Sequence, residues 1–250
     1  MRASLRSEFR KFLSVRSTYA ITGFVFVFTL FIAFYVVGWR MNYHDLHDPT
    51  QLAHDVTGAL NMTLFGAIAA ILLVTHEYRY NTIVYTLTSS NSRQKVLLSK
   101  FIVISLYAIF LALLIGILSP IVADLGVLAS GHTLVPQTLH YGDLIWRSLF
   151  YGWGYGMAGL LLALLIRNQV ASIAALFVIP GLAEQLLGLL FKHNTVYLPF
   201  SALNHVINPD ITNTPTSSTL SAGKAAGVYC IYLVVGGFVS WVLFLKRDAN

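Results

Sequence analysis

The chain has 250 residues, of which 56% are hydrophobic and only 10% are charged, with 16 Lys and Arg against 10 Asp and Glu. A soluble domain carries about 25% charged residues, so this composition excludes a soluble globular protein and indicates that lipid surrounds most of the chain. The single cysteine excludes disulfides within the chain and metal sites built from several cysteines, and the excess positive charge is typical of cytoplasmic loops rather than of nucleic-acid binding.

An amphipathic helix is predicted at the N-terminus, over residues 1–17. Its apolar positions have helical spacing, and its arginines recur every four residues and form a basic stripe. Such a helix lies in the plane of the cytoplasmic headgroups, either as a simple anchor or with a mechanical role. The apolar positions are Leu5, Phe9, Phe12 and Leu13, and the arginines are Arg2, Arg6 and Arg10.

Six apolar runs approach the roughly 20 residues that a helix needs to cross the hydrocarbon core. The runs are residues 18–39, 58–75, 101–123, 144–166, 170–191 and 225–245. The first run is too long for the apolar core of a signal peptide, about 7 to 15 residues, and is predicted to be retained. The third can begin earlier, because the long side chain of Lys100 can snorkel toward the headgroups. The sequence therefore predicts an all-α membrane protein with one domain of six transmembrane helices and an N-terminal interfacial helix.

The basic residues predict the orientation of the bundle. With the N-terminus inside, twelve of the 16 basic residues fall on the inner side, and six aspartates fall on the outer side. Cytoplasmic loops carry the excess of Lys and Arg, so both termini, including the tail 246–250, are predicted to be cytoplasmic.

The inner segment between the second and third spans, residues 76–95, reads HEYRYNTIVYTLTSSNSRQK. Its middle is apolar enough for a short helix, which the Ser and Asn residues at 89–92 then end. An apolar helix on the cytoplasmic face exposes a patch that a partner would cover. The alternative is a loop that lies on the membrane surface.

The order of polar residues in this region resembles a known family. Membrane subunits of ABC-2 type transporters usually carry here a Glu, a Gly-Thr, a Leu, a turn of small residues, an Arg and a Lys. This chain has Glu77, Asn81-Thr82, Leu87, Asn91-Ser92, Arg93 and Lys100, with Asn81 in place of the glycine. Residues 5–20, 164–187 and 197–200 are also similar to segments of such subunits. The resemblance implies the ABC-2, type V exporter-like architecture in a bacterial cytoplasmic membrane.

The resemblance also implies how the protein is powered. A separate cytoplasmic ATP-binding subunit, in two copies, would bind ATP and Mg and dock on the segment after span two. A second copy of the permease would complete a homodimer, since six spans form half of such a transporter. The implied docking residues are Glu77, Tyr78, Arg79, Thr82, Ile83, Leu87 and Arg93.

The implied function is export of an amphipathic substrate, such as a peptide, a drug or a lipid, with no catalytic residue and no cofactor in this chain. No G-x-x-x-x-G-K-[ST] run for binding a nucleotide phosphate occurs in the sequence. One alternative is a substrate-binding membrane subunit of an uptake system. An intramembrane enzyme is less well supported, because the sequence has no H-E-x-x-H motif and Glu184 has no histidine in its own span.

Two features within the spans stand out. A carboxylate inside the membrane is costly, so Glu184 is a candidate functional residue, or else a structural partner of Gln185 or Arg147. Gly152 and Gly156 form a G-x-x-x-G pair, which permits close helix packing either within the chain or between copies.

The outer loops complete the pattern. Histidines and aspartates alternate in the first outer loop, but their spacing matches no known ligand set, so no metal site is predicted. The loop residues are His44, Asp45, His47, Asp48, His54 and Asp55. The outer segment 192–224 is predicted to contain a short, re-entrant helix, because Phe200, Leu203, Val206 and Ile207 have helical spacing.

Overall fold

The computed structural model describes residues 2–41, 51–80, 82, 93–134, 141–191, 194–208 and 220–246. Throughout these residues the chain forms helices and no strand, which confirms the all-α prediction. Six of the helical stretches are long and apolar enough to cross a membrane, which confirms the predicted number of spans. The implied docking residues Ile83 and Leu87 lie outside the described residues, as do His44 and His47 of the first outer loop.

The helices follow one another with few interruptions. The first three spans are α2 (Arg16–Phe31) with the π-helix η1 (Ile32–Trp39), then α4 (Gln51–Leu60), η2 (Asn61–Phe65) and α5 (Gly66–Arg79), then α7 (Arg93–Ala129). The last three are α8 (Tyr141–Ile166), then α9 (Gln169–Val178), η3 (Ile179–Ala183) and α10 (Glu184–Phe191), then α12 (Ala222–Lys246). The shorter elements are α1 (Arg2–Ser14), η4 (Thr195–Tyr197) and α11 (Pro199–Ile207).

The third helix extends well beyond the apolar run that the sequence suggested. It begins at Arg93 and has 37 residues, so Lys100 lies two turns inside it. The fifth span changes to π-helix at Ile179–Ala183, where Pro180 removes a backbone donor and Gly181 follows it. The π-helical segment changes the register of the fifth span without ending it.

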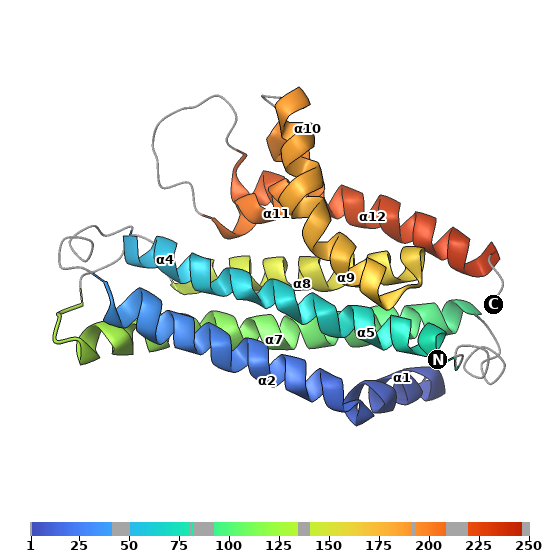
Figure 1. Cartoon of the computed structure of the whole chain (residues 1–250), viewed down its shortest axis with the longest axis horizontal. Coiled ribbons are helices and arrows are strands. Elements are labelled where there is room, and N and C mark those ends of the chain that lie inside the picture. Colours follow the sequence, from blue (N-terminus) through green and yellow to red (C-terminus); the bar gives the residue numbers. More distant parts are fainter. Residues whose placement is uncertain are drawn as a thin grey trace.

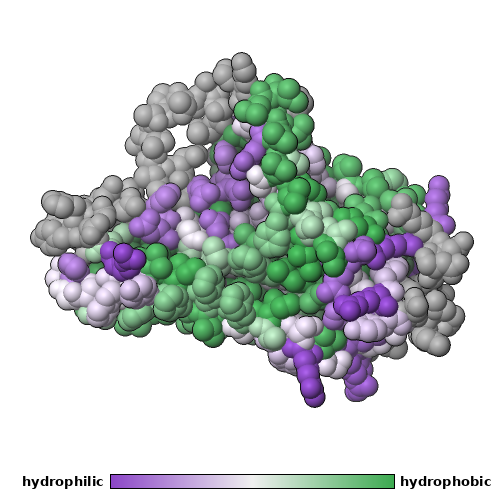
Figure 2. Space-filling model, viewed as in Figure 1, coloured by the Kyte–Doolittle hydropathy of each residue, from purple (hydrophilic) through white to green (hydrophobic). Residues whose placement is uncertain are grey.

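The bundle has a packed centre and a periphery that is exposed to lipid. The helices α2, α5, α7 and α8 run side by side along the long axis, while α9, η3 and α10 form an arm that leaves the bundle at a steep angle (Figure 1). In the spans that contain α5 and α8, 67% of the most apolar window is buried, against 22%, 11% and 17% for the first, fifth and sixth spans. Hydrophobic side chains cover the middle of the visible face and the arm (Figure 2).

One end of the bundle carries most of the charge. There α1 begins, α5 ends, α7 begins and α12 ends, and we call this the charged end (Figure 1). Strongly hydrophilic residues gather there (Figure 2). The described basic residues at this end are Arg6, Arg10, Lys11, Arg16, Arg79, Arg93, Lys95, Lys100, Arg167 and Lys246.

The glycine pair in α8 makes a contact inside the chain. A Cβ at Gly152 would lie 2.7 Å from the Cβ of Ala112, and one at Gly156 would lie 2.8 Å from the Cβ of Ala108. The G-x-x-x-G face therefore packs against small residues of α7, which decides between the two packing alternatives that the sequence left open.

The closest approach of two backbones joins η1 to α7. A Cβ at Gly126 would collide with the carbonyl oxygen of Phe34 and lie 2.9 Å from the Cα of Gly38. Because these neighbours are backbone atoms, they cannot move aside without shifting a whole helix.

Gly126→Ala is therefore expected to destabilise the protein by about 1 to 3 kcal/mol, the usual cost of overpacking. The measurement is unfolding by SDS titration in mixed micelles. Gly23→Ala is the matched control, because a Cβ there would meet nothing within 4 Å. Equal stability of the two variants would show that η1 and α7 are not in contact.

Candidate functional site

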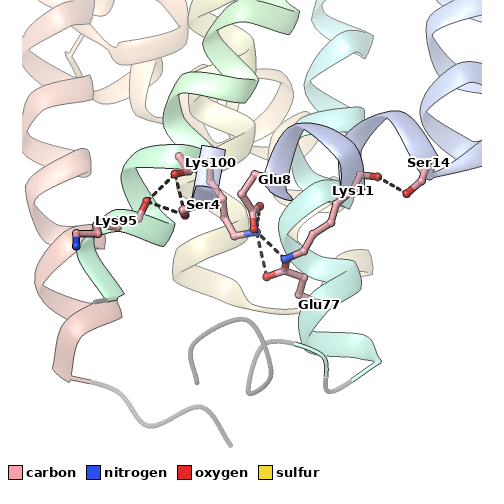
Figure 3. Close-up of polar contacts among 8 residues, drawn as sticks. Ser4, Glu8, Lys11, Ser14, Glu77, Lys95 and Lys100 are labelled. Carbon is pink, nitrogen blue, oxygen red and sulfur yellow. Dashed lines mark hydrogen bonds and ion pairs between the residues drawn. The ribbon is translucent and has the colours of Figure 1, made fainter. Parts of the chain in front are cut away.

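Four charged side chains meet at the charged end, and we call them the four-charge cluster. The Nζ of Lys100 lies 2.7 Å from Oε2 of Glu8 and 3.0 Å from Oε2 of Glu77. The Nζ of Lys11 lies 2.9 Å from Oε1 of Glu8 and 2.8 Å from Oε1 of Glu77. The charges thus alternate around a closed ring that joins α1, α5 and α7 (Figure 3).

The inward face of α1 explains why the ring forms. Ser4, Glu8 and Phe12 recur every four residues and so lie on one side of the helix. The hydroxyl of Ser99 in α7 donates to that of Ser4 over 3.0 Å, and the rings of Phe12 and Tyr107 lie 4.7 Å apart. These contacts fix α1 along the N-terminal half of α7 and bring Glu8 to Lys100.

The predicted amphipathic helix is present as α1, but its apolar residues divide between two faces. Phe12 is buried against the bundle, while Phe9 and Leu13 are 45% and 44% exposed. The sequence pattern treated all four apolar positions as one face, because the spacing of apolar residues alone does not show that a charged residue, Glu8, faces inward.

Three members of the cluster are almost fully buried. The exposed fraction of the side chain is 1% for Lys100, 2% for Glu8 and 7% for Glu77, against 35% for Lys11. Buried charges are tolerated only when they are paired, and two carboxylates facing two ammonium groups leave no net charge. The cluster therefore holds α1, α5 and α7 in one arrangement.

This burial corrects two expectations from the sequence. Lys100 does not snorkel toward the headgroups, because its ammonium is enclosed by Glu8 and Glu77. Glu77, expected on the docking surface, points into the bundle instead. Any effect of Glu77 on a partner would therefore pass through the position of α5.

The cluster shifts the ionisation of the two members that lie in α1. Burial alone would raise the pKa of the Glu8 carboxyl, but the charge and hydrogen bond of Lys100 and those of Lys11 outweigh it and lower the pKa. Burial alone would lower the pKa of Lys11, but its hydrogen bonds and charge interactions with Glu77 and Glu8 raise it.

The shifts predict how stability depends on pH. The pKa of Glu8 is lowered, so its contribution is present above its ordinary value of 4.5 and is lost as pH falls below it through the folded pKa. The pKa of Lys11 is raised, so its contribution is present below 10.5 and is lost as pH rises beyond that value. Thermal melting in a neutral detergent should show a plateau between these limits. In Glu8→Gln the melting temperature should fall less steeply as the pH drops below 4.5. An unchanged fall would contradict the ion pairing of Glu8.

The other described positions of the expected docking surface surround the end of α5. Arg79 is exposed and donates to Oε1 of Gln169 over 3.4 Å, and Thr82 is also exposed. The guanidinium of Arg167 lies over the ring of Tyr78 at 5.1 Å. Arg93 donates to the carbonyl oxygen of Leu245 over 3.3 Å, which ties α7 to α12. Arg79 and Thr82 are thus exposed members of this surface, and Tyr78 and Arg93 are half-buried.

Glu184 binds a helix rather than a side chain of opposite charge. Its Oε1 accepts from the backbone N–H of Phe200, and its Oε2 accepts from the N–H and the hydroxyl of Ser201, each over 2.7 Å. Glu184 is 5% exposed, and the neighbouring Gln185 is exposed. The carboxylate therefore caps the N-terminus of α11, where the partial positive charge of the helix favours an anion.

Arg147 lies at the opposite end of the same short helix. Its Nη1 donates to the carbonyl oxygen of Val206 over 3.1 Å, near the C-terminus of α11. A cation is favoured at that end of a helix. From the sequence, Glu184 was considered a structural partner of Gln185 or Arg147. Instead, Glu184 binds the N-terminus of α11 and Arg147 binds its C-terminal part.

Aromatic side chains of α8 pack against α11. The rings of Tyr155 and Phe200 lie 5.4 Å apart, and those of Tyr151 and Tyr155 lie 4.8 Å apart. The hydroxyl of Tyr151 donates to Oδ1 of Asn204 over 3.4 Å. The predicted short helix is therefore present and docked on α8; its re-entrant character stays a prediction.

The described part of the chain brings no three metal-binding side chains together. Of the outer-loop residues, His54 and Asp55 are described, with Nδ1 and Oδ1 3.5 Å apart. A pair of exposed neighbours in the sequence is not a metal site.

The sequence matches one family model, described as ABC-2 family transporter protein, over residues 4–181. The matched part runs from α1 into η3. It therefore contains the four-charge cluster and the helices α1, α5 and α7 that carry it. The chain belongs to the ABC-2 transporter family. No curated protein matches it. As an ABC-2 membrane protein, the chain is a transport component that is not itself catalytic, and members of its family normally work with an ATP-binding subunit.

Proposed function

We propose that this ABC-2 membrane protein is the permease subunit of an ATP-driven exporter that moves an amphipathic substrate, such as a peptide, a drug or a lipid. The observation that carries the proposal is the connection between the four-charge cluster and the segment that follows α5. Glu77 is a member of the cluster, and the exposed Arg79 and Thr82 follow within five residues. A partner that binds these exposed residues would act on the end of α5.

The cluster supplies a path for that action. A displacement of α5 moves Glu77, which is paired with Lys100 of α7 and Lys11 of α1. Because the three side chains other than Lys11 are nearly excluded from water, the pairs are not exchanged for hydration and the helices move together. Movement at the charged end would therefore reach the centre of the bundle through α7, which packs along α8.

The ATP-binding subunits would supply nucleotide and Mg, since the sequence holds no phosphate-binding loop. We propose two copies of that subunit and a second copy of the permease. The weakly packed arm α9–α10 supports the second copy, because only 11% of its most apolar window is buried within this chain. By the positive-inside rule, the basic residues at the charged end favour a topology in which this end faces the cytoplasm of a bacterial cell.

Co-purification tests the docking proposal. The chain is co-expressed with a candidate ATP-binding subunit, and Thr82→Arg is expected to lower the recovered ATP-binding subunit by at least about tenfold, or 1.4 kcal/mol. Ser7→Arg is the matched control, because Ser7 is exposed on α1 at the same end. Full recovery with Thr82→Arg would remove the segment after α5 as the docking site.

A further inference from the structure

A cavity of about 320 Å³ lies in the elbow between α1 and α2, against the end of α5. This volume falls within the range of pockets that hold small ligands, about 300 to 1,000 Å³. The lining residues that matter here are Lys11, Val15, Thr18, Leu72, Leu73 and His76. The cavity thus shares Lys11 and Glu77 with the four-charge cluster but lies beside it.

The polarity of the cavity changes along the axis of the bundle. The first span begins at Arg16 and the second ends at Arg79, so the cavity lies at the boundary of the membrane. Leu72 and Leu73 precede Arg79 by seven and six residues, roughly 10 Å into the hydrocarbon at 1.5 Å per residue. The polar wall therefore faces the headgroups and the apolar wall faces the acyl chains, which is the orientation of a lipid in that leaflet.

Of the two charged cluster members that line the cavity, the cation Lys11 is much more exposed than the anion Glu77. Lys11 is 35% exposed, whereas the carboxylates it binds, on Glu8 and Glu77, are 2% and 7% exposed. The N-terminus of α2 also borders the cavity at Val15, where no side chain caps the helix. Both features favour an anionic group over a cationic one.

We propose that this cavity binds a phospholipid of the leaflet at the charged end. Its phosphate lies beside the ammonium of Lys11 and the start of α2, and the upper part of an acyl chain lies against Leu72 and Leu73. A bound phosphate shares Lys11 with Glu8 and Glu77, so occupancy of the cavity changes the four-charge cluster at the point where α5 ends. The lipid is thereby a ligand that adjusts the four-charge cluster. Its binding does not depend on ATP-driven export.

Native mass spectrometry of the delipidated protein in detergent, titrated with phosphatidylglycerol, tests the proposal. Val15→Trp fills the cavity and is expected to weaken binding of the first lipid at least about tenfold. Leu13→Trp is the matched control: it lies two residues away, is already 44% exposed, and does not line the cavity. Equal binding by Val15→Trp and the unaltered protein would overturn the proposal, provided that both melt at the same temperature in the absence of lipid. If Val15→Trp melts lower, Thr18→Leu, which removes a polar wall group and adds bulk, replaces it.

Two competitors separate a lipid from its parts. Inorganic phosphate at millimolar concentration is expected to leave the bound phosphatidylglycerol in place, and displacement by phosphate alone would show a simple anion site and overturn the lipid assignment. Diacylglycerol, which lacks the phosphate, is expected to bind at least about tenfold more weakly. Equal binding of diacylglycerol would show that Lys11 does not recognise the headgroup and would overturn the proposal.

Discussion

Replacing Lys100 by methionine is expected to lower the free energy of unfolding by about 3 to 5 kcal/mol, the range for breaking a buried ion pair from one side. The substitution leaves Glu8 and Glu77 with one cation, Lys11, between two buried carboxylates. The measurement is unfolding by SDS titration in mixed micelles. Lys95→Met is the control, because Lys95 lies on the same helix and is exposed.

A second variant distinguishes loss of the charge balance from loss of packing. Glu8→Met combined with Lys100→Met removes one anion and one cation and leaves the pair of Lys11 with Glu77. Replacing a buried ion pair by apolar side chains is often close to neutral, so most of the lost stability should return. A double variant as unstable as Lys100→Met alone would contradict the account of the cluster as a balanced ring.

Glu184→Leu is the other substitution with a large expected effect. It leaves the backbone N–H groups of Phe200 and Ser201 without their acceptor, at about 1 to 3 kcal/mol for each buried donor. Hydrogen exchange of the peptide that covers α11 should rise much more than that of α7 or α8. Gln185→Leu is the control, since Gln185 is exposed. Unchanged protection of α11 in Glu184→Leu would show that the carboxylate does not hold this helix.

Hydropathy was sufficient to predict the spans, because a bilayer imposes one length and one polarity on every helix that crosses it. The predicted short helix at Phe200 was also found, since its spacing was regular. The ends of the helices were harder to predict. α7 continues through Lys95 and Lys100, and no rule based on the hydropathy of single residues would extend a span across two lysines.

The partners of the charged residues could not be predicted from the sequence. Glu8 lies in a basic, amphipathic stretch, where its neighbours suggest a solvated face, yet it pairs with Lys100, 92 residues away. A lone acid among four arginines and a lysine was the one available signal that α1 has an inward polar face. The sequence correctly indicated that a carboxylate at Glu184 inside the membrane is costly in free energy. Its partners are backbone N–H groups, which every residue except proline carries, so the sequence could not identify them.

Crosslinking from single cysteines in intact membranes tests the central claim most directly, namely that a cytoplasmic ATP-binding subunit acts on this permease at the end of α5. Cys230, the single cysteine of the chain, is first replaced by serine. With a maleimide that carries a photoreactive benzophenone, Thr82→Cys is expected to crosslink to the co-expressed ATP-binding subunit, with a yield that changes when ATP is added. Lys224→Cys, at the opposite end of the bundle, is expected to give no such product. A product from position 224 and none from position 82 would contradict the account.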